Sequence, residues 1–346
     1  MAGIKKYPCP NCGAWLEFDS TLQKMKCPYC DSVFAVSDVA AEAASSPAAA
    51  AEETSPFGVY HCSGCGAEII ADDATAATNC PYCSSPVILQ SKVSGELMPD
   101  YIIPFKLSRE EAIAAFRRHL SGKKLLPKVF KSEHHLNEIK GVYVPFWLFD
   151  TTAGGQAVYK ATKSRVWSDA HYHYTETSNY RVERAGTIRF ENIPADGSRK
   201  MDDGLMESLE TFDFNKAVPF ESAYLSGYFA DRYDVSAEES RERIEKRVRQ
   251  SALDALEDTV TGYGSVTQES GNVQLLNTVK KYAMYPVWIL NTTWRGKTYM
   301  FAMNGESGKF VGDLPVDKMI YWKWRLLYAL GFAGVLYGAM YFLGVL

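Results

Sequence analysis

The sequence predicts an α+β fold in which two tandem cysteine-rich ribbons precede a mixed domain of helices and antiparallel sheet, followed by one C-terminal transmembrane helix. Three observations lead to this fold class. Four CxxC pairs precede residue 84, two helix-capping boxes lie between strand-like runs, and the last stretch of the chain is uncharged. The predicted segments are a first ribbon at 1–34, a linker at 35–56, a second ribbon at 57–90, an α+β domain at 97–317, an interfacial flank at 318–325 and an anchor at 326–346.

Composition sets the limits of this interpretation. A chain of 346 residues that is 47% apolar can form two or three domains around at least one large core. The net charge of −4 argues against a dedicated nucleic-acid-binding protein. All eight cysteines fall in CxxC pairs, which suits a reducing compartment and metal sites better than a disulfide framework.

The cysteine pairs form a duplicated module, because the second half repeats the spacing of the first 53 positions later. Each CxxC turn points two thiolates at one centre, and two turns complete a tetrahedral site without an open position for water. We therefore predict one structural zinc ion per ribbon; iron in a rubredoxin-like site and four disulfides are the alternatives. The predicted ligands are Cys9, Cys12, Cys27 and Cys30 in the first ribbon, and Cys62, Cys65, Cys80 and Cys83 in the second.

Glycines follow the second cysteine of each first pair, at Gly13 and Gly66, where a positive φ aims backbone N–H groups at the sulfurs. The charge of the ribbons bears on their partners. Residues 57–90 contain no Lys or Arg, so the second ribbon would repel phosphates. The first ribbon carries both signs, with Lys5, Lys6, Lys24 and Lys26 against Glu17, Asp19 and Asp31. A protein-binding or spacing role is favoured over nucleic-acid recognition.

The segment between the ribbons, residues 35–56, contains nine alanines and two prolines and has little that could attach it to a core. We expect it to leave the first ribbon free to move. In the α+β domain, Ser108 with Glu111 and Ser236 with Glu239 form capping boxes that open amphipathic helices.

Strands are expected over much of the remaining domain. Residues 141–150 and 283–294 share alternating large side chains around a Tyr-x-Pro pattern, and each is interpreted as the first arm of a hairpin. Together with the two capped helices they suggest an internal repeat of a helix-plus-sheet unit. The RGKT run at 295–298 lacks the first glycine of a phosphate loop and is a predicted hairpin turn, as is NGESG at 304–308.

Two polar clusters are weaker candidates for function. His171 and His173 alternate on a predicted strand near Glu176 and could bind a metal, although hydrogen-bonded sheet histidines are commoner. The loop at 193–203 gathers Asp196, Ser198, Asp202 and Asp203, and is either a binding loop or a solvated turn. No nucleophile, base and orienting group occur as a set, so the sequence does not predict an enzyme.

The last segment, residues 326–346, is an uncharged run of the length that crosses a bilayer as a helix. Aromatic and basic residues at 318–325 match a cytoplasmic interfacial flank. We predict a tail-anchored protein with its bulk in the cytoplasm; a buried core helix is the alternative. Gly334 and Gly338 form a GxxxG pattern that would suit a homodimer.

This combination of motifs resembles the bacterial TFIIB-type zinc-ribbon membrane proteins, which are often labelled as relatives of the primosomal helicase PriA. The resemblance rests on CPNCG, CPYC, CSGCG and CPYC, and on IPADGSRKMDDGLMESLE, YLSGYFADRYD and NGESGKFVGDLP. It implies a non-enzymatic adaptor at the inner face of the bacterial plasma membrane that recruits flotillin-like SPFH or PspA-like envelope-stress proteins. The runner-up is a membrane-tethered nucleic-acid-binding protein linked to replication or transcription, with the first ribbon as its contact.

Overall fold

The computed structural model describes most of the chain, from the first ribbon to the C-terminal helix. The described residues are 4–5, 7–45, 58–62, 68–71, 74–80, 85–93, 95–201, 203–209 and 212–343. Cys65, Cys83, Gly66 and Asp202, which carry predictions made above, lie outside them.

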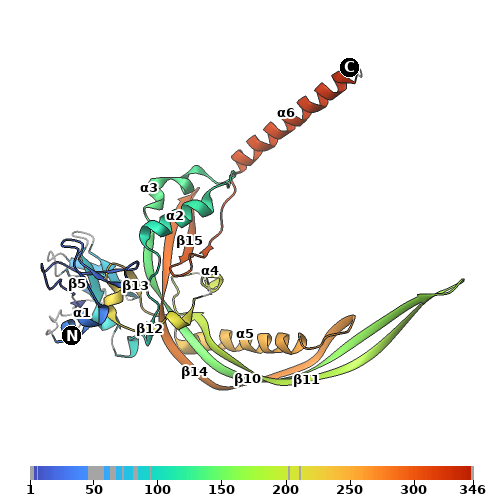
Figure 1. Ribbon diagram of the computed structural model, residues 1–346, viewed down its shortest axis with the longest axis horizontal. Helices are drawn as coiled ribbons and strands as arrows, with labels where there is room; N and C mark the ends of the chain where they lie inside the picture. The colour runs from blue at the N-terminus through green and yellow to red at the C-terminus, as the bar shows by residue number, and fades with distance from the viewer. Residues whose placement is uncertain are drawn as a thin grey trace.

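Three long antiparallel strands form the backbone of the molecule. β10 (Lys140–Ser168) lies between β14 (Ser265–Trp294) and β11 (His173–Asp196), and the three extend from the body as a bowed arm (Figure 1). The last β10–β14 pair is Thr162 with Ser265, so beyond it the arm narrows to the β10–β11 hairpin. β10 therefore crosses the body and also forms most of the arm.

Other strands widen the sheet inside the body. In the described part of the chain the sheet has 11 strands, in the order β1-β8-β7-β13-β10-β14-β15-β16, with β11 beside β10 and the short β9–β12 pair beside β14. These strands are β1 (Ile4–Lys5), β7 (Thr75–Asn79), β8 (Pro86–Leu89), β9 (Tyr101–Ile102), β12 (Val218–Pro219), β13 (Phe229–Asp231), β15 (Lys297–Asn304) and β16 (Phe310–Val311). Most pairs are antiparallel; β10–β13 and β14–β9 are parallel.

Helices cover both faces of the body sheet because side chains of β10 alternate between the two faces. Tyr143, Trp147 and Phe149 face the larger core, which includes side chains of α2 (Arg109–Leu120) and α5 (Ala237–Glu257). The intervening Val142, Val144, Phe146 and Leu148 face the second core with Met206 of α4 (Asp203–Ser208). The short helices α3 (Glu133–Leu136), η1 (Gln90–Val93), η2 (Gly95–Leu97), η3 (Lys128–Lys131), η4 (Phe214–Lys216) and η5 (Ser222–Leu225) connect these elements.

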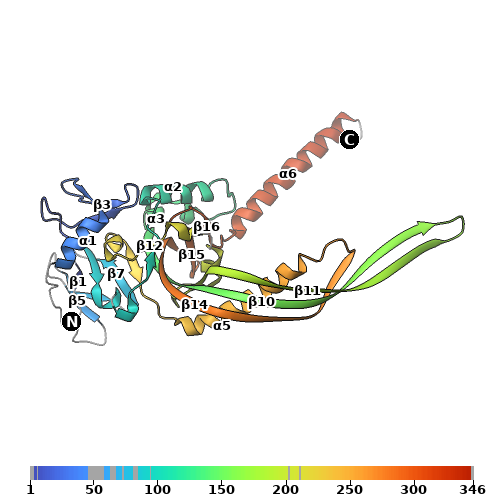
Figure 2. The ribbon, with the colours of Figure 1, turned by 60° about the horizontal axis from the view of Figure 1, so that its bottom comes forward.

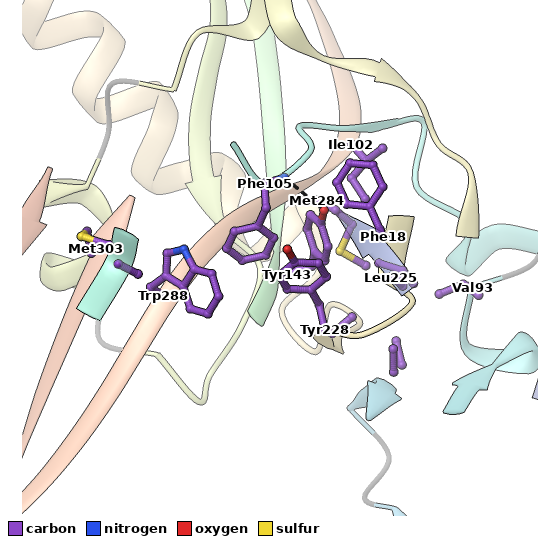
Figure 3. Packing of buried hydrophobic residues seen from close by; sticks show 14 of the residues in the cluster. Phe18, Val93, Ile102, Phe105, Tyr143, Leu225, Tyr228, Met284, Trp288 and Met303 are labelled. Atoms are coloured by element: carbon purple, nitrogen blue, oxygen red, sulfur yellow. Dashed lines mark hydrogen bonds between the residues drawn. The ribbon is translucent and has the colours of Figure 1, made fainter. Parts of the chain in front are cut away.

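An aromatic cluster lies at the centre of the larger core (Figure 3). The Phe105 ring stacks on Tyr228 with a centroid distance of 4.3 Å and meets the edge of Tyr143 at 5.0 Å. Trp288 of β14 lies 5.0 Å from Phe105 and 6.1 Å from Tyr228, so it contacts both rings. These rings come from segments far apart in the sequence, so their packing ties the sheet to the loops before and after it.

Helices begin at both predicted N-caps, and the first has the complete capping box. The Ser108 hydroxyl accepts from the Glu111 N–H at 3.2 Å, and the Glu111 carboxylate accepts from the Ser108 N–H at 2.8 Å. The Ser236 hydroxyl likewise accepts from the Glu239 N–H at 3.2 Å at the start of α5. α5 then runs along the arm, with Ile244, Val248 and Ala252 buried against it (Figure 2).

The two predicted turns are also confirmed, but the paired strands before them differ from the predicted repeat. Arg295 and Gly296 both have positive φ and join β14 to β15 in a two-residue hairpin, and residues 304–308 join β15 to β16. The run at 141–150 is not followed by a turn, because β10 continues to Ser168. It lies antiparallel beside the run at 283–294, as a neighbouring strand of the same sheet.

The first ribbon contains the sheet β2-β3-β4 and is fixed to the body. These strands are β2 (Glu17–Asp19), β3 (Lys24–Lys26) and β4 (Val33–Phe34). Phe18 is buried edge-on against Tyr224 at 5.0 Å, and the Tyr7 hydroxyl bonds Ser222 Oγ at 2.7 Å. Our expectation that this ribbon moves freely is therefore wrong, because its own apolar side chains contribute to the larger core.

The predicted linker is partly structured. Residues 36–45 form helix α1 (Val36–Ser45), which buries Val36, Val39 and Ala40 and contacts η5. Val36 and Val39, three residues apart, give this alanine-rich helix an apolar face. The amino-acid composition of the segment does not reveal that face. Residues 46–57 lie outside the described residues.

The C-terminal helix α6 (Lys318–Phe342) corrects the predicted fold class. Among the described residues, no helix has both the length and the apolar character that crossing a bilayer requires, so the predicted transmembrane helix and tail anchor are wrong. The described helix begins with the charged Lys318, Lys323 and Arg325, and the final residues 344–346 lie outside the described part. α6 points away from the body (Figure 1), and leucines such as Leu326 are exposed.

Gly334 and Gly338 lie on this exposed helix. An added Cβ at either position would meet no atom within 4 Å. The homodimer through these glycines stays a prediction.

Candidate metal centre

Four cysteine side chains converge in the first ribbon. The sulfur atoms of Cys9, Cys12, Cys27 and Cys30 all lie within 4.8 Å of one another. Two of the separations are 3.6 Å, from Cys9 to Cys30, and 3.5 Å, from Cys12 to Cys27. A tetrahedral Zn–S₄ site with bonds of about 2.3 Å has S–S edges of about 3.8 Å, so this donor set fits such an ion closely. The cluster can bind a metal ion.

The cluster is built from two matching turns. In the first, the Gly13 N–H donates to the Cys9 carbonyl at 2.8 Å, and Gly13 has the positive φ predicted for it. In the second, the Asp31 N–H donates to the Cys27 carbonyl at 3.0 Å, and Asp31 has a φ of 55°. Asp31 thus occupies the position of Gly13, and the tolerance of Asp for the left-handed region explains the exchange.

Two polar residues that sequence analysis missed connect these turns. Ser32 Oγ lies 3.2 Å from the Cys30 sulfur and accepts a hydrogen bond from Asn11 Nδ2 at 2.8 Å. The Ser32 hydroxyl and amide lower the pKa of the Cys30 thiol to about 6, which favours the thiolate that a metal requires. Asn11 and Ser32 lie within two residues of a CxxC cysteine, and this position in the sequence could have indicated their role.

The four ligands differ in exposure. Cys9 and Cys27 are buried in the larger core, whereas Cys12 and Cys30 are exposed. The site therefore lies at the edge of the core, with one ligand of each turn facing inward. Loss of Cys9 or Cys27 would therefore affect both the four-cysteine cluster and the packing around it.

The second cysteine module is described only in part. Cys62 and Cys80 are buried together in a small cluster with Tyr60 and Ile69, between β7–β8 and the pair β5 (Gly58–His61) and β6 (Glu68–Ala71). Their predicted fellow ligands, Cys65 and Cys83, lie outside the described residues. Among the residues described, the first ribbon holds the one cluster of potential ligands, and the second site stays a prediction.

The lysines that could have contacted nucleic acid do not form an open basic surface in the described part of the first ribbon. Lys26 pairs with Asp31 at 3.2 Å. The side chain of Lys5 and the whole of Lys6 lie outside the described residues. With Glu17 and Asp19 on the neighbouring strand, acidic charge balances the basic charge of Lys24 and Lys26.

The histidine pair does not form a metal site among the residues described. His171 lies in the turn at the tip of the arm, and His173 begins β11, so the two do not alternate along one strand as predicted. His173 Nδ1 bonds the Ser168 hydroxyl at 2.6 Å across the hairpin. His173 is therefore a hydrogen-bonded histidine in a sheet, which was the alternative to a metal ligand.

The acidic loop at 193–203 has a structural role where it is described. Asp196 and Ser198 are buried, and the Asp196 carboxylate accepts from the Ser198 N–H at 3.0 Å. The Gly197 N–H donates to the Pro145 carbonyl at 2.9 Å, which fixes the loop against β10. Asp203 begins α4.

A cleft of about 680 Å³ lies over the second face of the sheet. Apolar side chains including Ile289 and Met300 form part of its lining, together with Lys140 and the Lys200–Asp231 ion pair, whose N–O distance is 2.9 Å. Among the described residues, no cysteine or histidine lines it. The absence of enzymatic activity stays a prediction.

Comparison with known proteins identifies a relative but no activity. No family model matches the sequence, and no solved structure is similar to it. The uncharacterised protein YdjG of Bacillus subtilis (strain 168) is 31% identical over 318 residues, which span 91% of this chain and 91% of YdjG.

Proposed function

This chain belongs to the same family as YdjG of Bacillus subtilis, and we propose that it is a non-enzymatic adaptor whose zinc-stabilised ribbon binds a partner protein. The observation that carries the proposal is the closed four-cysteine cluster next to an exposed aromatic side chain. A four-thiolate zinc has no open position, so its contribution is to folding and not to catalysis.

Zinc is the metal proposed for Cys9, Cys12, Cys27 and Cys30, because tetrahedral four-thiolate sites are typical of structural zinc. We extend the proposal to a second ion in the second module. Its Cys80 N–H donates to the Ser85 carbonyl at 2.9 Å, as the Cys27 N–H does to the Ser32 carbonyl. The confinement of all cysteines to CxxC pairs supports a cytoplasmic location for the ribbons.

The proposed contact surface is the second turn of the first ribbon. Tyr29, between Cys27 and Cys30, is 80% exposed, and Leu22 and Val33 of the same ribbon are 48% and 41% exposed. Exposed tyrosines held on a rigid turn are common anchors of protein interfaces. The family resemblance noted from the sequence makes an SPFH-like or PspA-like protein the proposed partner.

Metal analysis of the full-length protein tests the first part. We expect two zinc ions per chain in the unmodified protein. Cys27→Ser should remove the ion of the first ribbon and Cys62→Ser the ion of the second module, so each variant should retain one. Asn11→Ala keeps all ligands and serves as the control. Retention of the full zinc content by Cys27→Ser would contradict the ligand assignment, and a single ion in the unmodified protein would refute the second site.

Binding measurements with purified SPFH-like and PspA-like proteins test the second part. Tyr29→Ala should weaken binding about tenfold or more, as truncation of an interface anchor does. Tyr172→Ala, at the distant tip of the arm, removes a tyrosine of similar exposure and should leave binding unchanged. Equal binding by all three proteins would exclude the Tyr29 surface.

A further inference from the structure

The outer edge of the arm is an unpaired strand. Within the described residues β11 pairs with β10 alone, so along its other side a row of backbone N–H and C=O groups has no strand partner. Long unpaired edges of this kind are templates for a further strand, and proteins usually shorten, bend or cover them. Here the edge runs from His173 with regular register to Phe190.

Four charged residues mark one face of this edge. Arg181, Glu183 and Arg189 are separated by even numbers of residues and therefore point to the same side of the sheet. Glu191, at the register shift that ends the regular pairing, is held on that side by Arg189. They form two ion pairs within the strand, Arg181–Glu183 at 3.3 Å and Arg189–Glu191 at 2.7 Å. All four side chains are more than half exposed, between 54% and 76%.

The order of these charges is self-complementary. Read in one direction the signs are plus, minus, plus, minus, and read in the other direction they are reversed. Two antiparallel copies of β11 with Gly186 at the centre would place Arg181 opposite the partner's Glu191 and Glu183 opposite the partner's Arg189. By symmetry this gives four cross-strand pairs of opposite charge, which stabilise an antiparallel sheet.

The same pattern disfavours neighbouring registers. Centring the pair on Ala185 would place Arg181 opposite the partner's Arg189. Centring it on Thr187 would place Glu183 opposite the partner's Glu191. Like charges directly opposite each other destabilise a sheet. The charges therefore favour pairing centred on Gly186 over the two neighbouring registers.

The other face of the arm leaves room for this arrangement. α5 contacts β10, β11 and β14, with Val182 of β11 buried beneath it. Leu256, at the end of α5, lies against both Gly155 of β10 and Gly186 of β11, so this end of the helix covers the β10–β11 pair. In the joined sheet the midlines of the two β10–β11 pairs would lie two strand spacings apart, about 10 Å, which matches the 8–10 Å between packed helices. Ala185, Gly186 and Thr187, at the centre, are small.

We propose that two copies of this chain associate through antiparallel pairing of their β11 edges about a two-fold axis at Gly186. The occupant of the edge is thus a second copy of the chain, and the joined arms form one continuous sheet with a body at each end. This inference does not depend on the metal site or on its proposed partner.

Charge exchange within one ion pair tests the register. The double variant Arg181→Glu with Glu183→Arg preserves the net charge and the ion pair within the strand, but it places like charges across the dyad. Arg189→Glu with Glu191→Arg does the same at the other end. Each should dimerise about tenfold or more weakly than the unmodified protein, with unchanged thermal unfolding of the monomer.

Mixing the two double variants is the decisive measurement. Every cross-strand pair is again of opposite charge in the mixed dimer, so a 1:1 heterodimer should form with an affinity near that of the unmodified protein. The chain that carries all four exchanges should also dimerise, because both ion pairs are inverted together. Sedimentation of full-length protein in a mild nonionic detergent, which covers the exposed side chains of α6, reports these states.

Several outcomes would overturn the proposal. One is an unmodified protein that stays monomeric at about 100 µM, a concentration above that at which specific pairs usually form. Others are double variants that dimerise as well as the unmodified chain, a mixture without heterodimers, and assemblies larger than a dimer.

Discussion

The two ends of β10 have the same secondary structure in opposite surroundings. From Val142 to Phe149 every side chain is buried, with alternate residues in two different cores. From Lys163 to Ser168 every side chain is intermediate or exposed, and the strand pairs with β11 alone. A continuous strand thus does not imply a continuous core. Hydrogen bonding to neighbouring strands determines the length of β10, whereas side-chain packing determines which part of it is most stable.

The stability of the two ends should therefore have different sources. In the body, burial of large apolar side chains dominates the free energy of folding. At the tip, the stabilisation comes from cross-strand pairs such as Trp167 with Tyr174, whose rings stack with centroids 5.5 Å apart. Such pairs contribute about 0.2–1 kcal/mol each. Three predictions test this contrast.

The largest effect is expected in the body. Phe146 is 1% exposed and stacks on Tyr285 at 4.7 Å. Phe146→Ala should lower the free energy of unfolding by about 3–5 kcal/mol, because it removes buried surface and leaves a cavity. Chemical denaturation measures the change, with the exposed Val166→Ala on the same strand as the control. A loss below about 1 kcal/mol would show that the second core does not hold the sheet together.

An intermediate effect, dependent on pH, is expected where α5 covers the arm. The carboxylate of Glu245 accepts hydrogen bonds from Arg241 at 2.8 Å and Arg249 at 2.9 Å, and these lower its pKa below the ordinary value. Because the folded pKa is the lower one, this contribution is complete above the unfolded value, about 4.3, and is lost as pH falls through the folded pKa.

Glu245→Gln should accordingly be less stable than the unmodified protein at neutral pH, with a difference that shrinks on acidification. Thermal unfolding between neutral and acidic pH measures this. Glu242→Gln, a neighbour on the same helix with no arginine partner among the described residues, is a suitable comparison. A difference that stays constant through the acidic range would contradict the assigned pKa shift.

The smallest effect is expected at the tip. Trp167→Ala removes a stacked but 42% exposed ring and should change the free energy of unfolding by less than about 1 kcal/mol. Amide exchange should become faster in the distal hairpin and stay unchanged in the body. If the variant unfolded as readily as Phe146→Ala, the two ends would form one cooperative unit and the contrast would fail.

Local features were the part of the fold that could be read in advance. The capping box at Ser108, the N-cap at Ser236, the turn at Arg295 and Gly296, and the positive φ of Gly13 depend on a few adjacent residues, and each occurs in the structure. The strand at 141–150 was recognised but not its extent, because the exposed residues after it carry no apolar alternation. Its length depends on pairing with β11 and β14, which are distant in sequence.

The candidate site shows the same division. The spacing of the CxxC pairs was enough to predict the four converging sulfurs, since each turn is local and two turns complete a site. The support from Asn11 and Ser32 was not foreseen, because it links two turns that only the folded ribbon brings together.

The sequence by itself determined the helix starts, the tight turns and the convergence of four cysteines in the first ribbon, since these follow from the chemistry of neighbouring residues. Only the tertiary structure decided that Phe18 fixes the ribbon to the body, that α1 packs where a linker was expected, and that no described helix spans a membrane. It also decided that β11 is an edge. These outcomes depend on which surfaces meet, and burial and strand pairing between distant segments leave no local signature in the chain.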